Sequence, residues 1–191
     1  MRLIALLLVT LVVLPSLGAC DRQKPEAPQA PAAEAGPVKG ADRSHKGEEA
    51  PTATFAGPDG GTTDIASFAG RPVLVNLWAT WCGPCVKELP TLQVMATEES
   101  AGQPVVIAIS QDDGDQATVD AFLGAKKIGR FAAFHDPAMG VMSALGVQVL
   151  PTTILYDAAG KEVWRYTGDL DWTSGEARAL VAEAAKIPRS S

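Results

Sequence analysis

From about residue 72 onward, short apolar runs alternate with stretches in which apolar residues recur at helical spacing. The first run, at 72–78, is apolar except for Asn76, which is typical of a strand buried on both faces. Helical spacing follows over about 83–97 and again over 115–126. Because strands that alternate with helices build a sheet covered by helices, this order predicts the α/β class.

The same patterns predict the remaining elements. Further strands are expected at 105–109, 131–134, 152–156 and 162–167, and further helices at 136–145, with Met139 on the apolar side, and from Thr173, with Glu176 completing a capping box. Residues 52–56 and 62–64 flank a Gly-Pro-Asp-Gly-Gly turn and predict an N-terminal hairpin. A short turn joins the last two strands, which should therefore be antiparallel. We expect a mixed central sheet flanked by helices.

The first 19 residues have the pattern of a secretory signal. Arg2 precedes an apolar run at 3–14, which is shorter than the ~20 residues of a membrane span but fits a signal peptide. The run ends in Leu-Gly-Ala-Cys20, which resembles a bacterial lipobox whose cysteine receives lipid. We therefore expect a lipoprotein-type signal peptide over 1–19 and lipid attachment at Cys20. A plain signal peptide, or an uncleaved anchor with an unmodified Cys20, is the alternative.

Composition divides the rest of the chain into two parts. Residues 20–50 are rich in Ala, Pro, Glu and Gly without apolar periodicity, so we expect a disordered, lipidated tether. Residues 51–191 are about 140 residues long, the size of one domain. The formal net charge of −6 is spread along the chain without a basic stripe, which gives no support for nucleic-acid binding.

The chain has three cysteines, two of them in the motif Trp81-Cys82-Gly83-Pro84-Cys85. The motif follows a predicted strand and begins a predicted helix, a context typical of thioredoxin-like redox sites. A helix N-terminus stabilises a thiolate, so Cys82 is expected to be the exposed attacking thiol and Cys85 the shielded resolving thiol. Pro84 suits the first helical turn, and Gly83 leaves room for a partner chain. Zinc would require four ligands, and the chain lacks two more at suitable places.

Beyond the motif itself, the segment 73–90 resembles the TlpA-like family of membrane-anchored thioredoxin-fold thiol:disulfide oxidoreductases, the TlpA, ResA and CcmG type. The sequence Leu-Pro-Thr-Thr at 150–153 and an extra helix and strand between 115 and 134 support the resemblance. It covers about 52–187. The resemblance implies a thioredoxin fold with an inserted αβ unit. It also implies relatives that act in cytochrome c maturation and in cytochrome oxidase assembly.

The resemblance assigns further site residues. Pro151 matches the family's cis-proline, which faces the cysteine pair and presents the Leu150 backbone to an incoming extended segment. Glu88 matches an active-site carboxylate, and its spacing also places it on the helix face of Cys85. An exposed helical glutamate is the alternative. Asn76 stands where ordinary thioredoxins carry a buried acid, which favours Glu88 for proton transfer. Trp81 is expected on the partner-facing surface.

These residues predict a reductant of partner-protein disulfides that needs no cofactor besides its redox-active disulfide. The resemblance implies apocytochrome c or a copper-site protein of cytochrome oxidase as substrate and a membrane thiol transporter as electron donor. The expected location is the periplasmic side of the inner membrane, through lipid on Cys20. A copper-binding assembly chaperone is the alternative, with His135 as a weak candidate ligand. A peroxidase is disfavoured because Ala79 stands where its pattern requires Thr or Ser.

Overall fold

The computed structural model describes residues 40–98 and 103–184. These residues form one mixed sheet of eight strands in the order β1-β8-β7-β4-β5-β6-β2-β3. The strands are β1 (Gly40–Asp42), β2 (Phe55–Ala56), β3 (Thr62–Thr63), β4 (Val73–Trp78), β5 (Val105–Ser110), β6 (Phe134–His135), β7 (Thr152–Tyr156) and β8 (Glu162–Thr167). Strands β4, β5 and β6 are parallel, whereas β7 runs antiparallel to both β4 and β8. The predicted mixed sheet is therefore confirmed.

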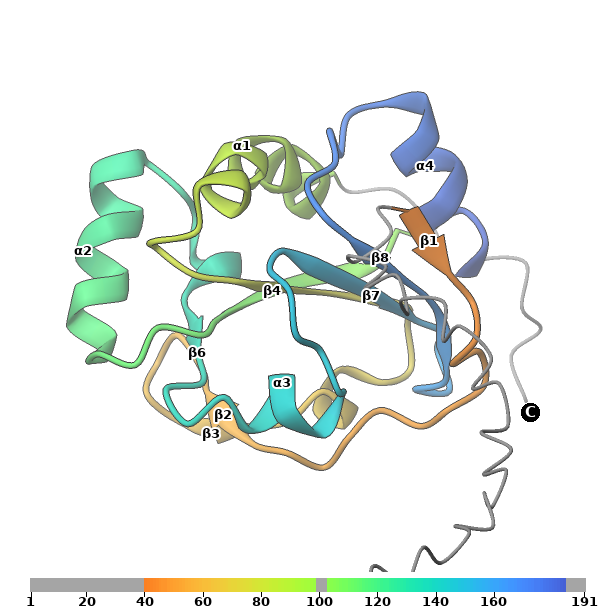
Figure 1. Ribbon diagram of the computed structural model, residues 1–191, viewed down its shortest axis with the longest axis horizontal. Helices are drawn as coiled ribbons and strands as arrows, with labels where there is room; N and C mark the ends of the chain where they lie inside the picture. Colours follow the sequence, from red (N-terminus) through yellow and green to blue (C-terminus); the bar gives the residue numbers. More distant parts are fainter. Residues whose placement is uncertain (1–39, 99–102, 185–191) are drawn as a thin grey trace, which may run out of the picture. The chain divides into compact units, whose positions relative to one another are not determined.

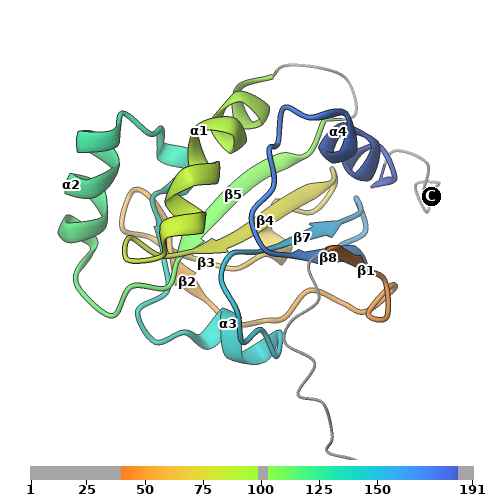
Figure 2. The same ribbon diagram turned by 45° about the horizontal axis from the view of Figure 1, so that its top comes forward.

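Helices cover both faces of this sheet. They are α1 (Gly83–Thr97), α2 (Gln116–Lys126), α3 (Gly140–Ala144) and α4 (Gly175–Val181), with short 3₁₀ turns η1 (Ala66–Phe68) and η2 (Arg130–Ala132). Helices α1 and α4 lie on one side of the sheet and α3 lies on the other (Figure 1). Helix α2 lies beside α1 (Figure 2). This arrangement is the expected three-layer α/β fold.

The central strand β4 contributes to both layers because successive side chains point to opposite faces. Leu74 and Trp78 belong to the core under α1, α2 and α4, whereas Val75 and Leu77 belong to the core under α3. All six residues of β4 are buried. Asn76 is on the same face as Leu74 and Trp78, directly beneath α1, which explains why a polar residue interrupts the apolar run.

The folded part begins earlier than the composition predicted, so the tether does not extend to residue 50. Strand β1 pairs with β8 along Gly40–Asp42, and Glu49 forms a bridge with Lys161. Backbone hydrogen bonds also join this segment to the β7–β8 hairpin, among them one from the Gly47 N–H to the Glu162 carbonyl at 2.8 Å. An edge segment held by its backbone needs no apolar periodicity, and for this reason composition did not reveal it.

Three local predictions near the helices were wrong. The strand expected at 131–134 is instead η2 followed by the shorter β6. The helix expected over 136–145 is the shorter α3, which begins at Gly140, and Met139 just before it is exposed with a left-handed backbone (φ 51°). The Asp136 carboxylate accepts from the backbone N–H groups of Gly140 and Val141 and so holds the first turn of α3. Helix α4 is capped by Ser174, whose hydroxyl accepts from the Ala177 N–H, and not by Thr173. The other strands and helices match the sequence pattern closely, including the N-terminal hairpin and helix α2.

The signal peptide and Cys20 lie outside the described residues, so their predicted roles stay predictions. Across 40–98 and 103–184, no helix combines the length and the apolar character that a membrane crossing requires.

Shortening the chain tests the revised domain boundary. A protein that begins at residue 51 should be less stable than one that begins at Gly40, by about 2 kcal/mol, because it loses β1 and several backbone hydrogen bonds to β8. Urea unfolding of the two proteins, followed by circular dichroism, measures the difference. Equal midpoints would show that residues 40–50 do not stabilise the domain and belong to the tether.

Candidate active site

The cysteine pair lies where β4 passes into α1. The chain leaves β4 at Trp78 and makes a turn over Ala79–Cys82 that is closed by the Cys82 N–H and the Ala79 carbonyl at 3.1 Å. Cys82 is the N-cap of α1, and its Sγ accepts from the Cys85 N–H at 3.3 Å. The two cysteines form a disulfide with an S–S distance of 2.00 Å. The pair therefore occupies the helix N-terminus, as the sequence predicts.

The two sulfur-bearing residues differ in exposure in the expected order. Cys85 is fully buried and Cys82 retains 6% of its accessible surface. Cys82 is thus more covered than predicted, because in the disulfide its Sγ is bonded to a sulfur inside the first helical turn. The part of the disulfide that remains accessible is therefore at Cys82.

The residues around Cys82 form an accessible rim. Trp81 is 68% exposed, a large fraction for a tryptophan, and Gly83 and Pro84 are also exposed. A Cβ atom at Gly83 would meet nothing within 4 Å, so the surface over the disulfide is open. Trp81 is consequently available to a partner protein and contributes little to the core.

Opposite this rim lies the cis-proline loop. The Leu150–Pro151 peptide bond is cis, as the resemblance implies. Because Leu77 pairs with Thr152, the register places Pro151 opposite Trp78, at the end of β4 from which the turn over Ala79–Cys82 departs. Leu150 is partly buried against both cores. Segments far apart in the sequence thus meet at this end of the strands.

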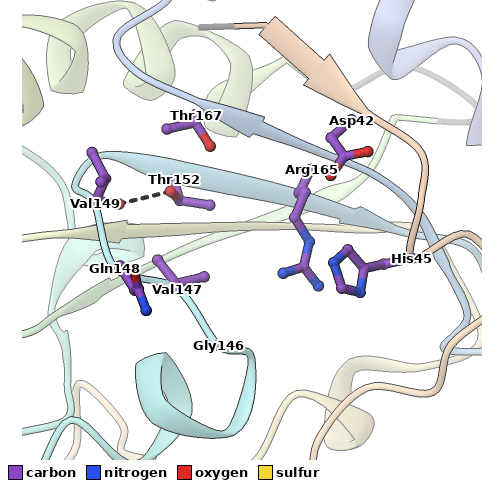
Figure 3. A pocket seen from close by; sticks show the side chains of 9 residues that line it. All are labelled: Asp42, His45, Gly146, Val147, Gln148, Val149, Thr152, Arg165 and Thr167. Atoms are coloured by element: carbon purple, nitrogen blue, oxygen red, sulfur yellow. Dashed lines mark hydrogen bonds between the residues drawn. The ribbon is translucent and has the colours of Figure 1, made fainter. Parts of the chain in front are cut away.

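A cavity of about 340 Å³ lies beside the cis-proline loop (Figure 3). Its lining residues come from β1 and the segment after it, the α3–β7 loop and strands β7 and β8: Asp42, His45, Gly146, Val147, Gln148, Val149, Thr152, Arg165 and Thr167. The Arg165 guanidinium is held by the Glu162 carboxylate and the Leu145 carbonyl. Neither cysteine lines this cavity, which is separate from the redox site.

Glu88 lies under the active-site helix and is only 3% exposed, so the alternative of an exposed helical glutamate is wrong. One carboxylate oxygen, Oε1, accepts from the Asn76 amide at 2.8 Å. The other, Oε2, accepts from the Leu170 N–H at 3.1 Å and the Trp172 indole N–H at 3.2 Å. Burial disfavours the charged form more strongly than these donors favour it, and it raises the pKa of Glu88 to about 7. A group with this pKa can accept or release a proton near neutral pH.

Asn76 connects this carboxylate to the cis-proline strand. Its amide nitrogen donates to Glu88 and also to the Thr153 hydroxyl at 2.9 Å. The sequence signal for this role was a polar residue inside an apolar strand. Leu170 and Trp172 carried no comparable signal, because their contacts with Glu88 span more than 80 residues.

His135, the weak candidate for a copper ligand, is buried and its Nε2 donates to the Asp112 carbonyl at 2.8 Å. Within the described ranges, no group of three or more His, Cys, Asp or Glu side chains is placed to hold a metal ion.

Comparison with known proteins adds an independent finding. The profile of the Redoxin family matches residues 45–182. The thiol-disulfide oxidoreductase ResA of Halalkalibacterium halodurans is 30% identical over 132 residues, which cover 68% of this chain and 74% of the relative.

Two solved structures have a similar fold. A thiol:disulfide interchange protein of the DsbE type from Chlorobium tepidum is 26% identical with a TM-score of 0.63, covering 73% of this chain and 96% of that one. The exposed lipoprotein thioredoxin of Streptococcus pneumoniae strain TIGR4 is 24% identical with a TM-score of 0.55, covering 69% and 98% respectively, and supports the fold alone.

Proposed function

Since the chain belongs to the Redoxin family and is a thiol-disulfide oxidoreductase of the TlpA and ResA type, we propose that it reduces disulfides of partner proteins through Cys82 and Cys85. The observation that carries this proposal is the placement of both cysteines at the N-terminus of α1, with an open rim above them and a buried carboxyl behind them. The reaction needs one thiol that attacks the partner disulfide and a second thiol that resolves the mixed disulfide. It also needs a group that takes the proton of the second thiol.

The reaction begins with the reduced pair. The Cys82 thiolate attacks one sulfur of the partner disulfide, an S–S bond forms between the two proteins, and the partner's other sulfur leaves as a thiolate. The N-terminal end of α1, with the Cys85 N–H directed at Sγ, stabilises the attacking anion. Trp81 and the Leu150 backbone at the cis-proline hold the partner segment in an extended conformation at the end of the central strands β4 and β7.

Resolution requires a thiolate at buried Cys85. We assign Glu88 as the base that takes this proton, directly or through an intervening water, because its pKa of about 7 allows the transfer near neutral pH. Cys85 then attacks Cys82 Sγ, the intramolecular disulfide forms, and the partner's second sulfur leaves. Two electrons have passed to the partner, and its two thiolates take up protons.

We further propose that this reduction occurs outside the cytoplasm, with the protein held at the periplasmic face of the inner membrane by lipid on Cys20. Disulfides persist in that compartment, so a reductant there has substrates but needs electrons from across the membrane. The thiols of apocytochrome c or of an oxidase copper site are the proposed substrates, and a membrane thiol transporter is the proposed donor. The lipobox-like residues and the family resemblance support this setting.

The reduction potential of the Cys82–Cys85 pair tests the direction of transfer. Residues 21–191, which lack Cys20, would be equilibrated in glutathione buffers and the free thiols counted by mass spectrometry. A value near or below roughly −250 mV is expected, because thioredoxin, with its reducing role, lies at about −270 mV. A value near roughly −120 mV would identify a disulfide donor and contradict the proposed function.

A further inference from the structure

A second buried carboxylate, that of Asp112, contacts the turn over Ala79–Cys82. Asp112 follows β5 and is 6% exposed. Its carboxylate accepts from the Thr80 hydroxyl at 2.6 Å and from the Thr80 backbone N–H at 3.0 Å. Thr80 lies two residues before Cys82, so Asp112 is hydrogen-bonded to the segment that carries the attacking thiol.

Thr80 is an inner residue of the turn over Ala79–Cys82. The turn determines where Trp81 projects and how Cys82 enters α1 as its N-cap. A turn of this kind on a protein surface is held by one backbone hydrogen bond unless side chains add to it. Here one carboxylate adds bonds to both the backbone and the side chain of the same residue.

Asp112 is itself held from two directions. The Ser110 hydroxyl donates to Asp112 Oδ2 at 2.5 Å, and the His135 Nε2 donates to the Asp112 carbonyl at 2.8 Å. Ser110 is paired with Trp78 across the β4–β5 ladder, which links the carboxylate to the rigid centre of the sheet. A buried carboxylate is costly unless hydrogen bonds satisfy it, and the Ser110 and Thr80 donors do so, whereas His135 holds the Asp112 backbone.

We propose that Asp112 is a positioning residue that clamps the Ala79–Cys82 turn, so that Cys82 Sγ stays aligned with the Cys85 N–H. Ser110 and His135 support the clamp, and Thr80 transmits it. The proposal rests on Cys82 being the attacking thiol and goes beyond the choice of substrate or donor. His135 thereby gains a structural role in the redox site without touching sulfur.

The rate of Cys82 alkylation in the reduced protein tests the clamp. Iodoacetamide would be used at pH 6, below the ordinary thiol pKa of about 8.5, so that the thiolate fraction limits the rate. Mass spectrometry after digestion identifies the modified cysteine. Asp112→Ala should slow Cys82 alkylation by roughly tenfold, because the loss of these hydrogen bonds moves Cys82 Sγ away from the Cys85 N–H, and this loss outweighs the gain in thiolate from removing a nearby carboxylate. Asp112→Asn, which retains one acceptor oxygen, should fall between Asp112→Ala and the wild-type protein.

Two threonine variants keep the test decisive if Asp112→Ala fails to fold. Thr80→Val preserves the shape of the side chain and removes only the hydroxyl donor, and it should slow alkylation several-fold. Thr80→Ser restores the donor and should react at the wild-type rate. This rescue distinguishes the clamp from a general effect of packing at residue 80.

Asp157→Ala is the matched control. Asp157 is also a buried carboxylate that accepts two backbone N–H groups, from Ala159 and Lys161, but it lies in the turn at the other end of β7. This variant should lose stability and keep the wild-type alkylation rate. Wild-type rates in Asp112→Ala or Thr80→Val would overturn the clamp. Alkylation of Cys85 before Cys82 in the wild-type protein would instead contradict the proposed function, on which the clamp depends.

Discussion

Replacing Cys82 with serine is expected to reduce the catalysed reduction of insulin disulfides to the rate observed without protein. Cys82 is the cysteine of the pair that retains exposure, and its Sγ lies at the positive end of α1. A serine hydroxyl does not ionise near neutral pH and cannot attack a disulfide. The measurement is the precipitation of insulin with dithiothreitol as electron source.

The other two cysteines supply the controls. Cys85→Ser keeps the attacking thiol and loses the resolving one, so it should accumulate a mixed disulfide between Cys82 and a model disulfide peptide, which mass spectrometry detects. Cys20→Ser should leave insulin reduction in solution unchanged, because Cys20 lies outside the matched family region. Substantial activity in Cys82→Ser would contradict the proposed mechanism.

Replacing Glu88 with glutamine is expected to change how the stability of the oxidised protein depends on pH. Burial raises the pKa of Glu88 from 4.5 to about 7, so the folded protein binds this proton more tightly than the unfolded chain does. The stabilisation is complete below pH 4.5 and is lost as the pH rises through 7. Over that range the wild-type protein should lose about 3 kcal/mol that Glu88→Gln does not lose.

The measurement is the free energy of unfolding in urea at several pH values between 4 and 8. The difference between Glu88→Gln and the wild-type protein should grow in favour of the variant as the pH rises. Glu98→Gln is the control, because the side-chain hydrogen bond from Arg178 lowers the pKa of Glu98 and gives the opposite sign. A difference that does not change with pH would show that burial does not raise the pKa of Glu88.

The two carboxyl groups near the redox site illustrate why tertiary structure was needed there. Glu88 shares a helix face with Cys85 through its spacing, which is a local property, but its raised pKa comes from burial in the folded protein. Asp112 stands next to Asp113 in sequence, and nothing local distinguishes them. Only the fold shows that Asp112 is buried and bonded to Thr80 while Asp113 is exposed.

The sequence by itself determined the features that arise within one element or one turn. The apolar run at 73–78 specified the central strand, and the Cys-Gly-Pro-Cys motif specified a redox pair at a helix N-terminus. Pro151 was assigned its cis bond by resemblance, and the structure confirms it. Side-chain periodicity and the chemistry of cysteine and proline act over a few residues, so one segment contains all that such predictions require.

Only the tertiary structure decided the features that join distant segments. It brought Thr153 to Asn76 and Asp112 to Thr80, and it added β1 to the edge of the sheet. Burial of a carboxyl group, and therefore its pKa, depends on every segment packed around it. Backbone pairing at an edge strand leaves no apolar pattern to detect. For these reasons the sequence pointed to the cysteine pair and to Glu88, whereas the burial of Glu88 and the contact between Asp112 and Thr80 emerged only from the packing.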